Sequence, residues 1–131
     1  MSEERNAAEM AAGLSETPGY RYADRVGDRL FVAGQVPTDS DGEILHVGDP
    51  AAQATRCLDN LRTVVEVNGF AVADVHRLTV HVVGEHQNLL DAWAAVRDWF
   101  GGEVPPATLL GAHLLGFTDQ LVEIDADILR A

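Results

Sequence analysis

Pro105-Pro106-Ala107-Thr108 begins an apolar run that is typical of a strand over residues 107–115, and Leu121-Val122-Glu123-Ile124 lies in a second strand expected over residues 120–129. Side chains alternate between the two faces of a strand, so the last strand has one apolar face and one acidic face. The apolar members are Val122, Ile124, Ala126 and Ile128, and the acidic ones are Glu123, Asp125 and Asp127. This alternation predicts a sheet that packs on helices with one of its faces.

Turn residues and helix-capping residues predict the remaining elements. Gly27-Asp28 is a hairpin-turn pair, Asp49 and Pro50 favour the start of a helix, and Gly69 favours its end. The expected elements are strands at 20–26, 29–33 and 74–83, a short strand near 43–45, and helices from 50 to about 68 and from 88 to 100. The order β-β-α-β-α-β-β predicts an α+β fold with a mixed sheet and both helices on one face. The other face would be partly apolar, which favours self-association.

The chain of 131 residues has the size of one domain, expected at residues 19–131 after a mobile lead-in at residues 1–18. Its apolar runs are far shorter than the roughly 20 residues that span a bilayer, and residues 1–15 lack the apolar centre of a secretory signal. We therefore expect no membrane partner and a cytoplasmic location. Cys57, the single cysteine, excludes an internal disulfide and is expected to be a core side chain.

The charge of the chain argues against a nucleic-acid partner. Twenty-one acidic residues and nine basic ones, all arginine, give a formal net charge of −12. Proteins that bind nucleic acids draw most of their affinity from cationic contacts to phosphates. No run of basic residues is present, so we expect a small-molecule ligand instead.

A set of short motifs falls in register along five-sixths of the chain. They are Gly27-Asp28, Phe31-Val32-Ala33-Gly34-Gln35-Val36-Pro37, Gly48-Asp49, Gln53, Asn60-Leu61, Asp74-Val75, Trp99-Phe100, Pro105-Pro106-Ala107 and Val122-Glu123-Ile124. From about Tyr20 to its end the chain resembles the reactive intermediate deaminase (Rid) family, also described as YjgF or endoribonuclease L-PSP-like. The resemblance implies a chorismate-mutase-like fold and a homotrimer with clefts at its subunit interfaces. It also implies hydrolysis of reactive enamines and imines to keto acids and ammonia, with no cofactor.

The resemblance also suggests which residues form the site. The family's glutamate, which positions water, corresponds to Glu123, and the tyrosine that closes the cleft corresponds to Tyr20. We expect both to be catalytic, although Glu123 could also be one of a row of surface acids and Tyr20 an ordinary strand-edge aromatic. The expected substrate-binding positions are Thr108, Gly34, Ala33, Leu110 and Trp93. Trp93 also has the helical spacing of a core residue.

Thr108 stands where well-studied members have an arginine that binds the substrate carboxylate. A threonine offers one neutral hydrogen bond in its place, which weakens binding of a 2-imino acid by about 2–4 kcal/mol. The expected function is therefore hydrolysis or tautomerisation of a small enamine or imine that is not a simple 2-imino acid. The alternative is a non-catalytic small-molecule binder or accessory protein that uses the same cleft.

Two further features leave alternatives open. His113 is expected on the strand that begins at Thr108, on the face opposite Thr108, and is a second candidate acid or base, although an interface or buried histidine is favoured. The row of Glu123, Asp125 and Asp127 could bind a divalent cation, but pairing with Arg77 or His81 on a neighbouring strand is favoured over a metal site.

Overall fold

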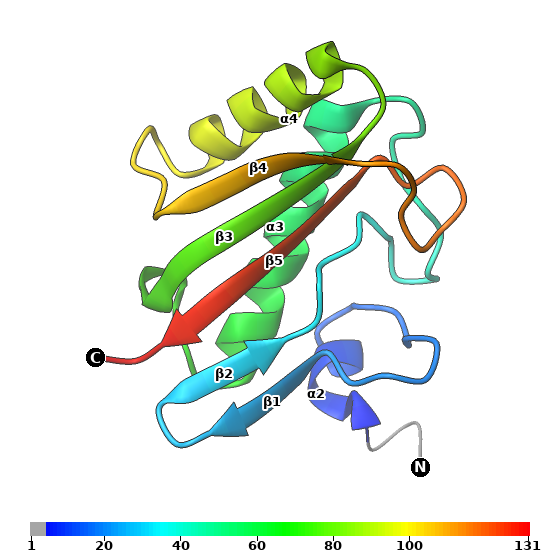
Figure 1. Ribbon diagram of the computed structural model, residues 1–131. Coiled ribbons are helices and arrows are strands. Elements are labelled where there is room, and N and C mark those ends of the chain that lie inside the picture. Colours follow the sequence, from blue (N-terminus) through cyan, green and yellow to red (C-terminus); the bar gives the residue numbers. More distant parts are fainter. Residues whose placement is uncertain (1–4) are drawn as a thin grey trace.

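A five-stranded mixed sheet forms the body of the molecule in the computed structural model, which describes residues 5–131 (Figure 1). Its strands are β1 (Ala23–Val26), β2 (Arg29–Val32), β3 (Val75–Val83), β4 (Ala107–Ala112) and β5 (Val122–Leu129). The strand order is β1-β2-β5-β3-β4, in which β3 and β4 are parallel and the other neighbours are antiparallel. The last strand of the chain therefore lies in the middle of the sheet.

Two long helices, α3 (Pro50–Val67) and α4 (His86–Trp99), pack on one face of the sheet (Figure 1). The Asp49 carboxylate accepts a hydrogen bond of 3.0 Å from the backbone N–H of Ala52, so the predicted helix start is confirmed. A short 3₁₀ helix, η1 (Val72–Asp74), connects α3 to β3. The expected α+β fold is confirmed. No helix within residues 5–131 has both the length and the apolar character that a membrane span requires.

The core lies between these helices and the sheet. Its fully buried side chains are Leu78, Val80 and Val82 of β3, Val122, Ile124 and Ile128 of β5, and Cys57, Leu58, Leu61 and Val65 of α3. The face of the last strand that was predicted to be apolar is therefore the helix-facing one. Burial raises the pKa of the Cys57 thiol well above its usual value, which leaves the thiol protonated and confirms its role as a core side chain.

The opposite face of the sheet is open in the single chain. Strand register places Thr79 of β3 beside both Thr108 of β4 and Asp125 of β5, and places His81 beside Leu110 and Glu123. Among the large apolar side chains on this face, Phe31 is 49% exposed, Leu110 36% and Leu129 50%. No element within residues 5–131 covers them.

Several element boundaries differ from the sequence-based expectation. Strand β4 ends at Ala112, three residues before the expected Leu115, because the chain leaves the sheet there and residues 113–121 form a loop. Strand β1 begins at Ala23, not at Tyr20. The strand expected near 43–45 is reduced to one isolated bridge between Thr38 and Ile44.

Residues 5–18, which belong to the expected lead-in, fold onto the domain. They contain the short helix α2 (Ala7–Ala11) and the fully buried Asn6, whose Oδ1 accepts a hydrogen bond of 3.0 Å from the backbone N–H of Tyr22. The Glu9 carboxylate accepts one of 2.7 Å from Asn68 just after α3. Residues 1–4 lie outside the described part of the chain, and the division into a mobile lead-in and a domain stays a prediction.

Candidate functional site

A cleft of about 600 Å³ opens where the N-terminal segment meets β2, β5 and the 113–121 loop. Its lining residues are Pro18, Tyr20, Ala33, Gly34, Val36, Gly116, Phe117 and Glu123. Four of these residues were predicted from the sequence: Tyr20, Ala33, Gly34 and Glu123. Tertiary folding thus brings four of the seven predicted site residues together within one chain.

Buried Gln120 holds the Glu123 carboxylate in the cleft. Its side-chain Nε2 donates hydrogen bonds of 3.1 Å to Glu123 Oε1 and to the carbonyl of Val122. Its Oε1 accepts a bond of 3.1 Å from the backbone N–H of Phe117, which forms part of the cleft wall. Gln120 therefore positions the Glu123 carboxylate relative to the part of the cleft wall that contains Phe117. Sequence reasoning missed both Gln120 and Phe117, since neither belongs to a motif.

Gly34 lies directly against the other oxygen of the same carboxylate. A Cβ atom built at position 34 would be 2.4 Å from Glu123 Oε2, closer than nonbonded atoms approach. The adjacent Gln35 exchanges backbone hydrogen bonds of 2.7 and 3.1 Å with Ile124, which fastens this segment to β5 beyond the end of β2. Only glycine therefore permits the observed position of Glu123.

Tyr20 lies at the mouth of the cleft, and its backbone carbonyl is held by the side chains of Thr17 and Asn6. Burial, followed by the charges of Tyr22 and Glu123 in their ionised forms, raises the pKa of the Tyr20 hydroxyl above its ordinary value. The hydroxyl therefore keeps its proton at neutral pH and can donate a hydrogen bond to a ligand.

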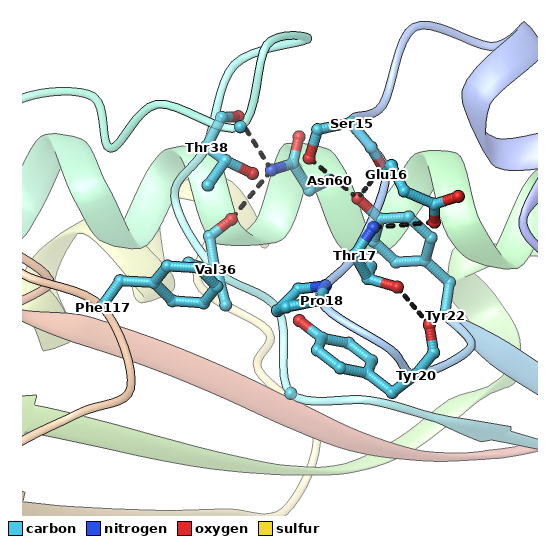
Figure 2. A pocket seen from close by; sticks show the side chains of 12 residues that line it. Ser15, Glu16, Thr17, Pro18, Tyr20, Tyr22, Val36, Thr38, Asn60 and Phe117 are labelled. Carbon is cyan, nitrogen blue, oxygen red and sulfur yellow. Dashed lines mark hydrogen bonds between the residues drawn. The ribbon is translucent and has the colours of Figure 1, made fainter. Parts of the chain in front are cut away.

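A smaller chamber of about 40 Å³ adjoins the cleft, and Figure 2 shows its lining. It shares Pro18, Tyr20, Gly34, Val36 and Phe117 with the cleft, and most of its other lining residues are polar. The Tyr22 hydroxyl donates a bond of 2.8 Å to the carbonyl of Ser15 at one side of it. Its volume and polarity suit a few water molecules.

Two buried amides on α3 support the loops around the site. Asn60 donates hydrogen bonds of 2.9 and 3.3 Å to the carbonyls of Val36 and Thr38 (Figure 2). Gln53 donates one of 3.0 Å to the carbonyl of Asp119 and accepts one of 2.8 Å from the N–H of Leu121. Both residues belong to the motif set found in the sequence, and the structure supplies their physical role.

The other predicted site residues lie elsewhere in the single chain. Thr108 and Leu110 are on β4, and β3 separates that strand from β5 by two strand spacings, about 10 Å in total. Trp93 lies on α4, where it packs against the core on the other face of the sheet. His113 is exposed in the loop after β4, outside the strand in which it was expected.

The acidic row of β5 is partly paired with basic side chains. His81 Nε2 is 3.0 Å from Asp125 Oδ2, as the favoured sequence interpretation expected, and Arg29 is 3.7 Å from Asp127. Arg77 makes no such pair, because its Nη2 donates a bond of 3.0 Å to the hydroxyl of Thr108. Within residues 5–131, no three histidine, cysteine or acidic side chains gather as metal ligands.

A family model described as endoribonuclease L-PSP matches residues 11–129, almost the whole chain. The chain belongs to the Rid family. A RutC family protein of Pyrococcus horikoshii is 31% identical to this Rid protein over 110 residues, which cover 82% of this chain and 83% of the relative.

Solved structures agree with this assignment. The YjgF gene product of E. coli has a TM-score of 0.79 and 26% sequence identity, with 91% of this chain and 94% of that chain covered. E. coli TdcF with bound serine has a TM-score of 0.74 at 23% identity, with 91% and 94% covered, and therefore shares the fold. The Rid fold and family are thus established for this chain.

Proposed function

We propose that this Rid protein hydrolyses or tautomerises a small enamine or imine in the cleft that contains Glu123. The observation that supports this proposal most directly is the state of the Glu123 carboxylate. Gln120 binds its Oε1, whereas Oε2 has no hydrogen-bond partner within residues 5–131 and is available to a water molecule. A carboxylate fixed in this way beside a protonated tyrosine hydroxyl suits proton transfer to and from water.

The chemistry requires few groups, because an imine carbon is already electrophilic. Water adds to that carbon while the Glu123 carboxylate accepts a water proton, and the imine nitrogen gains a proton. The resulting carbinolamine loses ammonia and leaves a carbonyl compound. An enamine first gains a proton on carbon, which converts it to the imine. In this scheme Tyr20 donates a hydrogen bond to the substrate, and the backbone near Gly34 and Ala33 holds it in the cleft.

We propose that the active assembly is a homotrimer with the cleft completed by a second copy. The exposed apolar side chains on the open sheet face favour self-association. In a cyclic assembly the β4 edge of one copy, with Thr108 and Leu110, can lie against the Glu123 cleft of the next. Trp93 would then contribute to the cleft only from α4 of a neighbouring copy. Serine bound to TdcF supports a small, amino-acid-like ligand.

The proposal can be tested with imines released by an amino-acid oxidase and trapped by semicarbazide. The wild-type protein should accelerate imine loss, and Glu123→Gln should reduce that acceleration by about 10²-fold or more. Asp127→Asn is a matched control, because it neutralises a neighbouring carboxylate outside the cleft. No acceleration by the wild type, with imines from any of a broad panel of amino acids and amines, would contradict the proposal.

A second candidate function is non-catalytic binding of a small molecule in the same cleft, favoured by Thr108 at the family's arginine position. It predicts that Glu123→Gln leaves ligand affinity unchanged and that the wild type converts no imine. Titration of a keto acid or amide into both proteins, followed by NMR, separates this function from catalysis.

A further inference from the structure

Arg77 extends across the open face of the sheet to Thr108. Its Nη2 donates a hydrogen bond of 3.0 Å to Thr108 Oγ1, although the two residues are on different strands. Strand register explains the contact, because Thr79 is the direct partner of Thr108 and Arg77 precedes Thr79 by two residues on the same face. The side chain thus reaches diagonally from β3 to β4.

The neighbouring carboxylates do not neutralise this guanidinium. Asp127, the cross-strand partner of Arg77 on β5, lies 3.7 Å from Arg29, and Asp125 lies 3.0 Å from His81. Within residues 5–131, no carboxylate lies within 4.0 Å of Arg77. A guanidinium has five N–H donors, so most of those on Arg77 are available to a ligand.

We propose that Arg77 and Thr108 together form a carboxylate-binding site that recognises a 2-imino or 2-keto acid. The planar fork of the guanidinium matches both oxygens of a carboxylate. Thr108, which accepts a bond from Arg77, can donate its own hydroxyl proton to the same ligand. The cation missing from position 108 is therefore supplied by the neighbouring strand, which removes the reason to exclude simple 2-imino acids as substrates.

This inference rests on the proposed function in one respect. A substrate carboxylate bound at Arg77 and Thr108 places the reacting carbon near Glu123 only if the cleft forms between two copies. In one chain, Thr108 and Glu123 lie on strands separated by β3, so they act on one small substrate only if different copies contribute them. Carboxylate binding itself depends on Arg77 and Thr108 of a single copy. The two ideas can therefore fail separately.

The test compares binding of 2-oxobutanoate with binding of its neutral amide, 2-oxobutanamide, by NMR titration of the full-length protein. The wild type should bind the acid about tenfold more tightly than the amide. Arg77→Gln should abolish this preference and leave amide affinity unchanged. Arg97→Gln is the matched control, because it removes the same charge from an exposed residue of α4 outside the open face, and it should retain the preference.

Retention of the acid preference in Arg77→Gln, or its absence from the wild type, overturns the proposal. If light scattering shows that Arg77→Gln no longer assembles like the wild type, Thr108→Val is used for the binding test instead. This variant keeps the charge of Arg77 and removes the hydroxyl of Thr108. A several-fold loss of acid affinity is expected for Thr108→Val, and an unchanged affinity overturns the proposal. In a correctly assembled Arg77→Gln background, Thr108→Arg should restore the preference.

Imine hydrolysis is scored separately with the oxidase assay. Acid binding that depends on Arg77, without hydrolysis of any imine, contradicts the proposed function and supports the binding site. If neutral imines are hydrolysed and Arg77→Gln has no effect on acid binding, the proposed function is supported and the carboxylate-binding site is contradicted.

Discussion

The cleft beside β5 contains four of the predicted site residues and the edge at β4 contains two, and these two regions are built in different ways. In the cleft, buried amides fix two groups: Gln120 holds Glu123, and Asn60 holds the chain that follows Gly34. At the β4 edge, one hydrogen bond between exposed Arg77 and Thr108 positions the cation. The proposed water chemistry is therefore preorganised within a chain, whereas the proposed carboxylate recognition relies on the long side chain of Arg77 at an open face.

The largest expected effect tests how rigid the cleft is. Gly34→Ala would place a Cβ atom 2.4 Å from Glu123 Oε2, so the carboxylate must move. We expect kcat/KM for imine hydrolysis to fall by about 100-fold, the scale of a lost general base. Gly116→Ala is the control in the same cleft, because a Cβ there meets nothing within 4 Å. Equal activities of the two variants would show that the cleft tolerates displacement of Glu123.

Gln120→Leu should have the next largest effect. It removes the hydrogen bond to Glu123 and leaves the N–H of Phe117 without its acceptor. We expect kcat to fall about tenfold and the free energy of unfolding to fall by about 1–3 kcal/mol. Steady-state kinetics and thermal unfolding measure these changes, with Gln87→Leu, on the exposed side of α4, as the control. A stability loss with unchanged kcat would limit Gln120 to a structural role.

Tyr20→Phe should reduce kcat/KM about fivefold, the value of one neutral hydrogen bond. Because the pKa of Tyr20 is raised, its hydroxyl stays protonated as the pH rises from 7 to 9. The activity ratio of wild type to Tyr20→Phe should therefore be constant over this range in pH–rate profiles. A ratio that falls toward one below pH 9 would mean that the hydroxyl ionises there.

Added salt should produce the smallest change in kinetics. Its effect on KM should distinguish the charged β4 edge from the cleft. Raising the ionic strength from about 0.1 M to about 1 M shortens the Debye length from about 10 Å to about 3 Å. The KM for an acidic imine should rise about threefold, because salt screens the attraction between Arg77 and the substrate carboxylate, and the KM for a neutral imine should not change. Equal responses of the two substrates would remove the electrostatic distinction between the β4 edge and the cleft.

The sequence alone determined the two long helices, the five strands of the sheet and the strand faces that are buried. These features are local: the alternation in β5, the Asp49-Pro50 helix start and the Gly27-Asp28 turn each act over a few residues. The family resemblance also pointed to Tyr20, Ala33, Gly34 and Glu123 as site residues, and all four line the cleft. Boundaries at Ala23 and Ala112 were missed, because departure from a sheet depends on neighbouring strands as well as on local propensity.

Only the tertiary structure decided the partners of these residues. Arg77 and Thr108 are 31 positions apart, and their contact depends on the register of two parallel strands, which a single sequence does not specify. The same is true of Gln53, which reaches Asp119 and Leu121 across the fold. From the sequence Thr108 indicated a lost cation, whereas the fold brings the cation of Arg77 to the same point. The physical reason is that the interaction between a charge and a ligand depends on their separation in space. The pairing of β3 with β4 sets the separation between Arg77 and Thr108.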